Sequence, residues 1–207
     1  MNNSYKTVEL NTQDEYLVKK SRFIGYIRPV STEEQARDFI AEISKKHWDA
    51  THNVYAYIIR DTGVKRYSDD GEPQGTAGIP VLDVLEKNSL TDCCVVVTRY
   101  FGGIMLGAGG LVRAYSHTAS LAVNAGSVIT MSMCAKLEIN CDYTFYGRLS
   151  SLIPESGGVI IDTVYESDVK VLFYLPLEDV PGFSAKLTEA SNGRYSAVKT
   201  GEFYAKV

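Results

Sequence analysis

The chain has 207 residues, 45% of them hydrophobic, and its 21 Lys and Arg against 25 Asp and Glu give a formal net charge of -4. This length allows one large domain or two modest domains, each able to bury a core. The slightly acidic balance excludes a protein that holds nucleic acid by overall positive charge, so any RNA contact must come from a local basic patch.

The N-terminal part of the chain predicts two or three strands followed by an amphipathic helix. Residues 5–30 have strand composition and include a proline near their end, Pro29. The motif Ser31-x-x-Glu34 is a capping box, which opens a helix. The apolar positions of this helix follow the i, i+3, i+4, i+7 pattern and are Ala36, Phe39, Ile40, Ile43 and His47. This periodicity predicts that one helix face packs on a sheet.

A second group of elements follows. Residues 52–60 alternate as a strand, and a turn with glycine leads into another strand at 64–67. Pro80 suits the first position of a short helix. The apolar face of that helix consists of Val81, Val84 and Leu85.

Next come a buried strand, a glycine-rich loop and a long helix. The β-branched run at residues 93–100 predicts the strand, and residues 111–125, closed by Gly126, predict the helix. The loop 101–110 brings backbone amides to a helix start, which is a ready site for phosphate or carboxylate. The alternative is that its glycines only allow close packing. The spacing fits neither G-x-G-x-x-G nor a P-loop, so the loop supports neither a dinucleotide fold nor an NTPase.

The C-terminal part predicts a split β-α-β unit. In chain order its elements are a strand at 134–141, a helix capped by Asp142 and ended by Pro154 with the glycines at 157–158, strands at 159–165 and 169–175, a helix at 179–191 and a strand at 195–206. This order, β-α-β-β-α-β, is that of ferredoxin-like folds. We therefore predict an α+β protein with domains at residues 1–130 and 131–207, joined by a short linker at 127–132.

An acidic turn precedes the short helix. Asp69, Asp70 and Glu72 place three carboxylates within four residues. Mg²⁺ often uses only one or two carboxylates with water, so this turn permits a divalent cation, although the EF-hand spacing is missing. The alternative is a structural role in which these carboxylates pair with Arg66, Arg99 or Arg113 and hold two loops together.

The motifs DDGEPQGTAGIP and RYFGG-x3-G-x2-GL-x-RAY, preceded by KKSRFIG and HWDATHNVYAY, closely resemble the IMPACT family, in its bacterial YigZ-like branch. The resemblance covers roughly residues 5–128 as the family's N-terminal domain, and the rest looks like the small C-terminal domain of bacterial members. It implies a first domain similar to the second domain of a small-subunit ribosomal protein and a ferredoxin-like domain similar to the last domain of EF-G. Both analogies point to translation.

The resemblance also implies what role not to expect. Eukaryotic members restrain the amino-acid starvation kinase by competing for its activator, but those chains also carry an RWD domain. The sequence shows no such domain, so we do not expect the kinase role here. We expect a non-catalytic regulator that contacts RNA, the ribosome or a translation factor through its N-terminal domain, with no DNA partner. The acidic C-terminal part suits contact with protein.

Several N-terminal side chains are candidates for such contact. The cations are Lys19, Lys20, Arg22, Lys45, Lys46, Lys65, Arg66, Arg99 and Arg113, with Tyr67, Tyr100 and Tyr115 for stacking on bases. The alternative is a solvated charged face, with Tyr115 in the core. The predicted ligand-binding set is Arg66, Asp69, Asp70, Glu72, Thr76, Arg99, Tyr100, Gly102, Gly103, Gly107, Gly109, Gly110 and Arg113. In it, Arg99 and Arg113 bind phosphate beside the amides of residues 107–110.

An enzyme is the competing class. A histidine beside a carboxylate can act as a general acid or base, which makes His52 and Asp70 the candidates, with loop amides stabilising negative charge. No G-x-S-x-G, H-E-x-x-H or Cys-His signature names a nucleophile or metal. The alternative function is thus a small hydrolase or an anion-binding protein.

The N-terminal residues, the apolar stretches and the cysteines suggest a cytoplasmic protein. The polar N-terminus has no apolar signal region and no apolar stretch is long enough to span a bilayer, so we expect no membrane contact. The 4 cysteines lack C-x-x-C spacing, and we expect four buried, inert thiols. We expect no cofactor, with a divalent cation or phosphate as the open alternatives.

Overall fold

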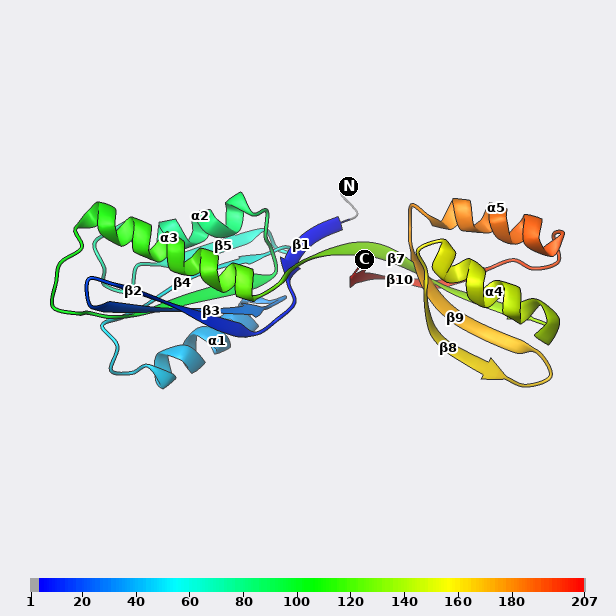
Figure 1. The fold of residues 1–207 in the computed structure, drawn as a ribbon, viewed down its shortest axis with the longest axis horizontal. Coiled ribbons are helices and arrows are strands. Elements are labelled where there is room, and N and C mark those ends of the chain that lie inside the picture. The colour runs from blue at the N-terminus through cyan, green and yellow to red at the C-terminus, as the bar shows by residue number, and fades with distance from the viewer. Residues whose placement is uncertain (1–3, 207) are drawn as a thin grey trace. The chain divides into compact units, whose positions relative to one another are not determined.

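The computed structural model describes residues 4–206 (Figure 1). The chain forms two compact units, one of residues 5–130 and the other of residues 131–206 together with Ser4. The N-terminal unit contains β1 (Ser4–Val8, which begins one residue before it), β2 (Thr12–Val18), β3 (Ser21–Pro29), α1 (Glu33–Lys46), β4 (His52–Ile59), β5 (Val64–Ser68), α2 (Gly78–Lys87), β6 (Cys93–Tyr100) and α3 (Ala108–Ala125). Five of these strands form a sheet in the order β2-β3-β6-β4-β5, and every neighbouring pair is antiparallel.

Two hydrophobic cores lie on the two faces of this sheet, because successive residues of a strand point to opposite faces. In Figure 1, α1 covers one face and α2 and α3 cover the other. The central strand β6 sends Cys94 and Val96 toward the core of α1, and Val95 and Val97 toward the core of the other two helices. A strand buried on both faces explains the unbroken apolar run in the sequence.

A glycine sets how closely α3 approaches the sheet. A Cβ atom at Gly25 of β3 would lie 2.7 Å from the backbone oxygen of Thr118 in α3. No side chain larger than hydrogen fits there without moving the helix. The glycine of the KKSRFIG motif is therefore explained by packing of α3 on β3.

The C-terminal unit has the predicted order of elements. They are β7 (Val128–Cys141, whose first three residues belong to the N-terminal unit), α4 (Tyr143–Glu155), β8 (Val159–Tyr165), β9 (Val169–Pro176), α5 (Val180–Ser191) and β10 (Val198–Lys206). Within this unit β7 pairs with β9 and β10, and β8 pairs with β9, all antiparallel. The two-unit α+β architecture agrees with the sequence prediction, whereas the likeness to a ribosomal protein domain and to EF-G stays a prediction.

Several predicted boundaries were wrong by a few residues. The N-cap of α1 is Thr32, whose side chain accepts from the Gln35 amide, rather than Ser31. Helix α2 begins at Gly78, so Pro80 is its third residue. Helix α3 begins at Ala108, which places Gly109 and Gly110 in the helix rather than in the loop.

Two further expectations concern the C-terminal half. Most of the predicted linker 127–132 is strand, since β7 starts at Val128. Pro154 lies inside α4, which continues to Glu155.

All four cysteines are free and buried, and burial raises the pKa of the Cys93 thiol to about 12. Among the described residues, no helix has the length and apolar character needed to cross a membrane.

Candidate functional site

The two segments that stand out in the sequence meet at Glu72. Its Oε1 atom lies 2.5 Å from a guanidinium nitrogen of Arg99 and accepts a hydrogen bond of 2.8 Å from the Tyr115 hydroxyl. The His52 Nε2 atom is 3.8 Å from the same oxygen. The side chains of Glu72 and Arg99 are 3% and 7% exposed. We call these four residues the Glu72 cluster, and they join the acidic turn to β6, α3 and β4.

Arg99 is enclosed in this cluster. Its guanidinium carbon lies 5.4 Å from the ring centres of both Phe23 and Phe101. Its Nε atom is buried with no hydrogen-bond partner in the described part of the chain. Burial and the neighbouring Glu72 carboxylate raise the pKa of the Tyr115 phenol, so Tyr115 stays a donor to Glu72. Arg99 is therefore paired with a carboxylate of the acidic turn, as in the structural alternative of the sequence analysis. It does not face solvent as a phosphate ligand would.

The other carboxylates of the turn are bound to backbone. Asp69 accepts hydrogen bonds from the amides of Gly75, Ala77 and Gly78 at 2.8 to 3.1 Å, and so satisfies the start of α2, whose N-cap has no side-chain bond of its own. Asp70 accepts from the amide of Asn53 at 2.6 Å. The Thr76 hydroxyl donates to the Pro73 carbonyl at 2.6 Å and likewise stays within the turn.

These contacts bear on the metal and enzyme alternatives. The described residues include no group of three or more His, Cys, Asp or Glu placed to hold a metal ion. His52 and Asp70 are adjacent, but the contact of 2.6 Å joins the His52 Nδ1 atom to the backbone carbonyl of Asp70 rather than to its carboxylate. That bond orients the ring with Nε2 toward Glu72. These contacts stabilise the turn.

The glycine-rich loop ends at an open helix start. Gly107 is the N-cap of α3, with φ 73°, no side-chain cap and no acidic residue in the first turn. The amides of Gly110 and Leu111 already donate to the Gly107 carbonyl, so the hydrogen-bond ladder of the helix begins inside the predicted loop 101–110. The amides of Ala108 and Gly109 lie ahead of that ladder. Gly103, with φ 78°, is a loop position that favours glycine.

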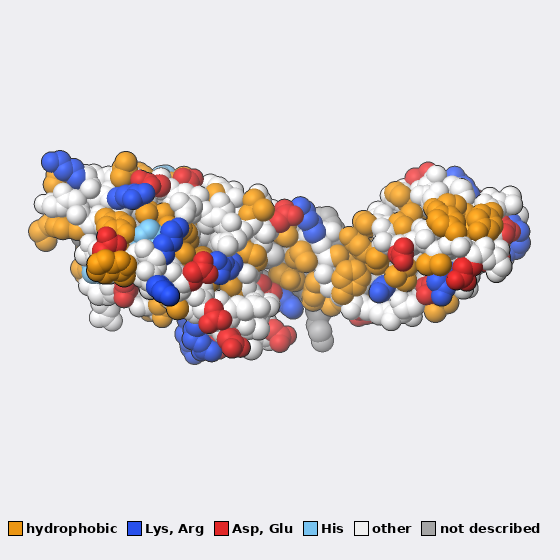
Figure 2. Space-filling view, turned by 90° about the horizontal axis from the view of Figure 1, so that it is seen from below, with side chains coloured by type: hydrophobic (Ala, Val, Ile, Leu, Met, Phe, Trp, Pro, Cys, Tyr) orange, Lys and Arg blue, Asp and Glu red, His pale blue; other side chains and the backbone are white. Residues whose placement is uncertain are grey.

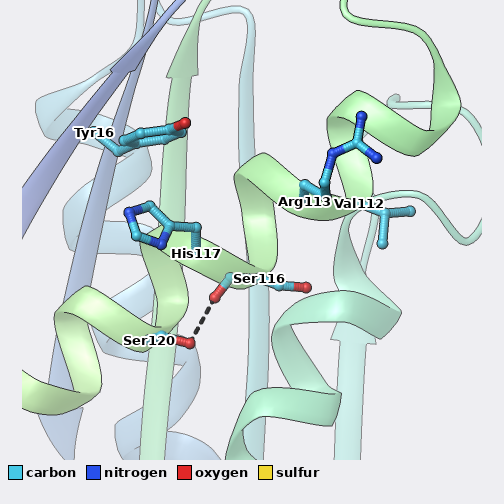
Figure 3. A pocket seen from close by; sticks show the side chains of 6 residues that line it. All are labelled: Tyr16, Val112, Arg113, Ser116, His117 and Ser120. Carbon is cyan, nitrogen blue, oxygen red and sulfur yellow. Dashed lines mark hydrogen bonds between the residues drawn. The ribbon is translucent and has the colours of Figure 1, made fainter.

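Arg113 lies apart from the Glu72 cluster. It is exposed on the outer side of α3 and lines a shallow groove with Val112, Ser116, His117 and Ser120 of the helix and Tyr16 of β2 (Figure 3). The rings of Tyr16 and His117 pack edge to face, with their centres 4.5 Å apart. In the described part of the chain, Arg113 has no ion pair with the acidic turn. Sequence reasoning missed His117 and Ser120, although they stand four and seven residues after Arg113, the spacing of one helix face.

The remaining predicted ligands are dispersed. Arg66 of β5 lies opposite Tyr57 of β4, on the α1 side of the sheet. Tyr100 also belongs to that side, where its hydroxyl lies 2.8 Å from His47 Nδ1 and donates to Asp49 at 3.1 Å. Gly102 packs against the β2–β3 turn, since a Cβ there would lie 2.0 Å from the Lys20 carbonyl carbon.

The predicted basic patch is not one surface. Ion pairs engage three of its members, joining Arg22 to Glu15, Lys65 to Glu86 and Arg99 to Glu72. Lys45 and Lys46 end α1, across the sheet from α3. The cations left near the glycine-rich loop are Lys19, Lys20 and Arg113.

Comparison with known proteins identifies the chain. The family model for the Impact N-terminal domain matches residues 19–123, and that for a domain of unknown function, DUF1949, matches residues 139–194. The chain belongs to the IMPACT family. It is 42% identical to the IMPACT family member YvyE of Bacillus subtilis (strain 168) over 98% of this chain and 93% of the relative. It is 35% identical to YigZ of Escherichia coli (strain K12), over 85% of this chain and 88% of the relative.

A solved structure, described as the crystal structure of an hypothetical protein, is similar over both units. It matches with a TM-score of 0.62 and 31% sequence identity, covering 97% of this chain and 99% of that one. The family expected from the sequence motifs is thereby confirmed, and the α+β architecture is shared across the full length.

Proposed function

We propose that this IMPACT family member is a translation-associated regulator that binds ribosomal RNA through the α3 side of its N-terminal unit, without catalysing a reaction. The observation that carries the proposal is the absence of carboxylates from this part of the sequence. Between Asp92 and Glu138 the chain contains no acidic residue, and this stretch includes the glycine-rich loop and all of α3. Phosphate can approach such a surface without repulsion from nearby side chains of the same stretch.

The cations and amides on this side suit a sugar-phosphate backbone. Arg113 is exposed near the start of α3, whose first amides and dipole favour an anion. Lys19 and Lys20 form the β2–β3 turn against which Gly102 packs, so both lysines lie beside the loop. Tyr16 and the half-exposed Phe101 offer ring faces for bases.

The α1 side of the unit carries charges of both signs. Figure 2 shows the side of the N-terminal unit on which α1 lies, where Lys and Arg side chains alternate with Asp and Glu. Interspersed charges of both signs are typical of a solvated surface and give little net attraction for a polyanion. The acid-free stretch that includes the glycine-rich loop and α3 is therefore the better candidate for RNA.

Co-sedimentation with ribosomal subunits tests the proposal. We expect association that weakens between about 50 and 200 mM salt, and that is lost or reduced in Arg113→Ala and in Lys19→Asn/Lys20→Asn. Asparagine is chosen because both lysines have positive φ, at 44° and 65°, which asparagine tolerates. Arg148→Ala removes one exposed charge from α4 and serves as the matched control.

The slope of affinity against salt gives a second reading. Each lost phosphate contact should reduce the slope by about one unit, whereas the control should leave it unchanged. No association at the lowest salt would overturn the proposal. Association that resists salt and ignores these substitutions would point instead to a protein partner such as a translation factor.

A further inference from the structure

A second groove lies on the other side of the N-terminal sheet, between α1 and the edge strand β5. Arg37 and Ile40 of α1 form one wall, Arg66 of β5 forms the other, and Tyr55 and Tyr57 of β4 lie between them. The acidic turn and the glycine-rich loop contribute no residue to the lining of this groove. The proposed RNA surface is on the α3 side of the same sheet, so the two surfaces are separate.

Two arginines face this groove from different elements. Arg66 is the register partner of Tyr57 in the β4–β5 pair, and Arg37 stands one helical turn after Glu33 in α1. Both arginines are exposed, and neither forms an ion pair with any described residue. Unpaired guanidinium groups on two walls of one groove suit an anion between them, and the planar donor fork of arginine matches phosphate.

The floor of the groove is an ordered aromatic pair. The rings of Tyr55 and Tyr57 are stacked, with centres 6.3 Å apart and planes 15° apart. Tyr57 is 4% exposed, and its hydroxyl donates to Glu33 at 3.0 Å, which fixes its position. Tyr55 is half-buried and lines the groove, so a planar ring can stack on it. Glu33 holds the Tyr57 hydroxyl through one carboxylate oxygen and can accept a sugar hydroxyl through the other.

We propose that this groove binds a nucleoside monophosphate group, with the base over Tyr55, the phosphate between Arg37 and Arg66, and a ribose hydroxyl at Glu33. The group can belong to a free nucleotide or to the 5′ end of an RNA. The proposal goes beyond RNA binding on the α3 side and does not depend on it. The charge favours this ligand, since two cations face one phosphate while the single carboxylate is taken up by hydroxyl groups.

Calorimetric titration of the full-length protein with AMP tests the assignment. Arg37→Ala and Arg66→Ala should each weaken AMP binding by about tenfold, because each removes a charge-assisted hydrogen bond to phosphate. Tyr55→Ala should weaken AMP binding, whereas Tyr55→Phe should retain it because the ring is kept. Inorganic phosphate has no base, so its affinity should fall in the arginine variants and stay unchanged in Tyr55→Ala. Far-UV circular dichroism confirms that each variant is folded.

Two competition experiments with oligonucleotides distinguish a free nucleotide from the 5′ end of an RNA as the ligand. Competition of a 5′-phosphorylated RNA against AMP, with no competition by its 5′-hydroxyl counterpart, would assign the groove to RNA ends. Competition by neither would assign it to free nucleotides. The inference is overturned if AMP does not bind at millimolar concentration and the phosphorylated RNA does not bind the groove, or if binding survives Arg37→Ala/Arg66→Ala. Arg113→Ala, on the α3 side, should leave AMP binding unchanged, so failure here is distinct from failure of ribosome binding.

Discussion

The buried carboxylate of Glu72 lies 2.5 Å from the guanidinium of Arg99 and connects two segments that are 27 residues apart in the chain. Tyr115 donates to the same carboxylate oxygen from α3. A turn, a strand and a helix therefore depend on one acidic side chain. Because these elements also carry the glycine-rich loop, the ion pair positions the surface proposed to contact RNA.

Replacing Glu72 with glutamine should strongly destabilise the N-terminal unit. Glu72→Gln leaves the Arg99 charge buried and uncompensated, and breaking a buried pair in this way costs about 3–5 kcal/mol. Glu72→Gln/Arg99→Met should cost less than the sum of the two single changes, because no buried charge remains. Urea unfolding measures both effects. Glu34→Gln, exposed on α1, is the control and should change the free energy of unfolding by less than about 1 kcal/mol. Additive single and double variants would show that the pair is uncoupled.

Two glycines near the start of α3 should respond to alanine in opposite ways. Gly102→Ala places a Cβ 2.0 Å from the Lys20 backbone, so the loop has to move away from the β2–β3 turn, at a cost to stability and to ribosome association. Gly109 lies inside the helix, and the Cβ added by Gly109→Ala would lie 3.9 Å from the Arg113 guanidinium. This substitution should therefore raise the free energy of unfolding by up to about 1 kcal/mol. Thermal unfolding compares the two, and equal effects would contradict this account of the loop.

His47 should make stability depend on pH. Burial, reinforced by the nearby positive charges of Lys46 and Arg22, lowers the pKa of His47 below the ordinary value of 6.5. The unfolded chain therefore binds the proton more readily, so the contribution of His47 is fully present above about pH 6.5 and is lost as the pH falls toward its folded-state pKa. Urea unfolding from about pH 7 to 5 should show a steeper decline for the wild type than for His47→Gln. Parallel curves would exclude this role.

Asp69 should act as a helix cap supplied from outside the helix. Asp69→Ala removes the acceptor of three backbone amides, including those of Ala77 and Gly78 at the start of α2, and should cost about 1–3 kcal/mol. Asp69→Asn keeps one acceptor oxygen and should cost less. Hydrogen exchange at the first amides of α2 reports the loss directly. The exposed Asp38→Ala is the matched control on α1, and equal losses in all three variants would refute a capping role.

Sequence patterns determined those elements whose burial is continuous along the chain. The bounds of β6 were predicted correctly because a strand buried on both faces is apolar without interruption. The buried face of α1 and the order of elements in the C-terminal unit follow from periodicity and capping, which are local properties. The family was likewise evident from the motifs alone.

Only the tertiary structure decided what depends on contacts between distant segments. The starts of α2 and α3 were misplaced because their first residues are glycine-rich and poor in helix propensity, and α2 is completed by Asp69 from the preceding turn. Arg99 and Arg113 are equivalent as sequence letters, yet one is buried against Glu72 and the other is exposed. Which arginine pairs and which remains free for a ligand depends on which residues the fold brings within hydrogen-bond distance, and local pattern does not carry that information.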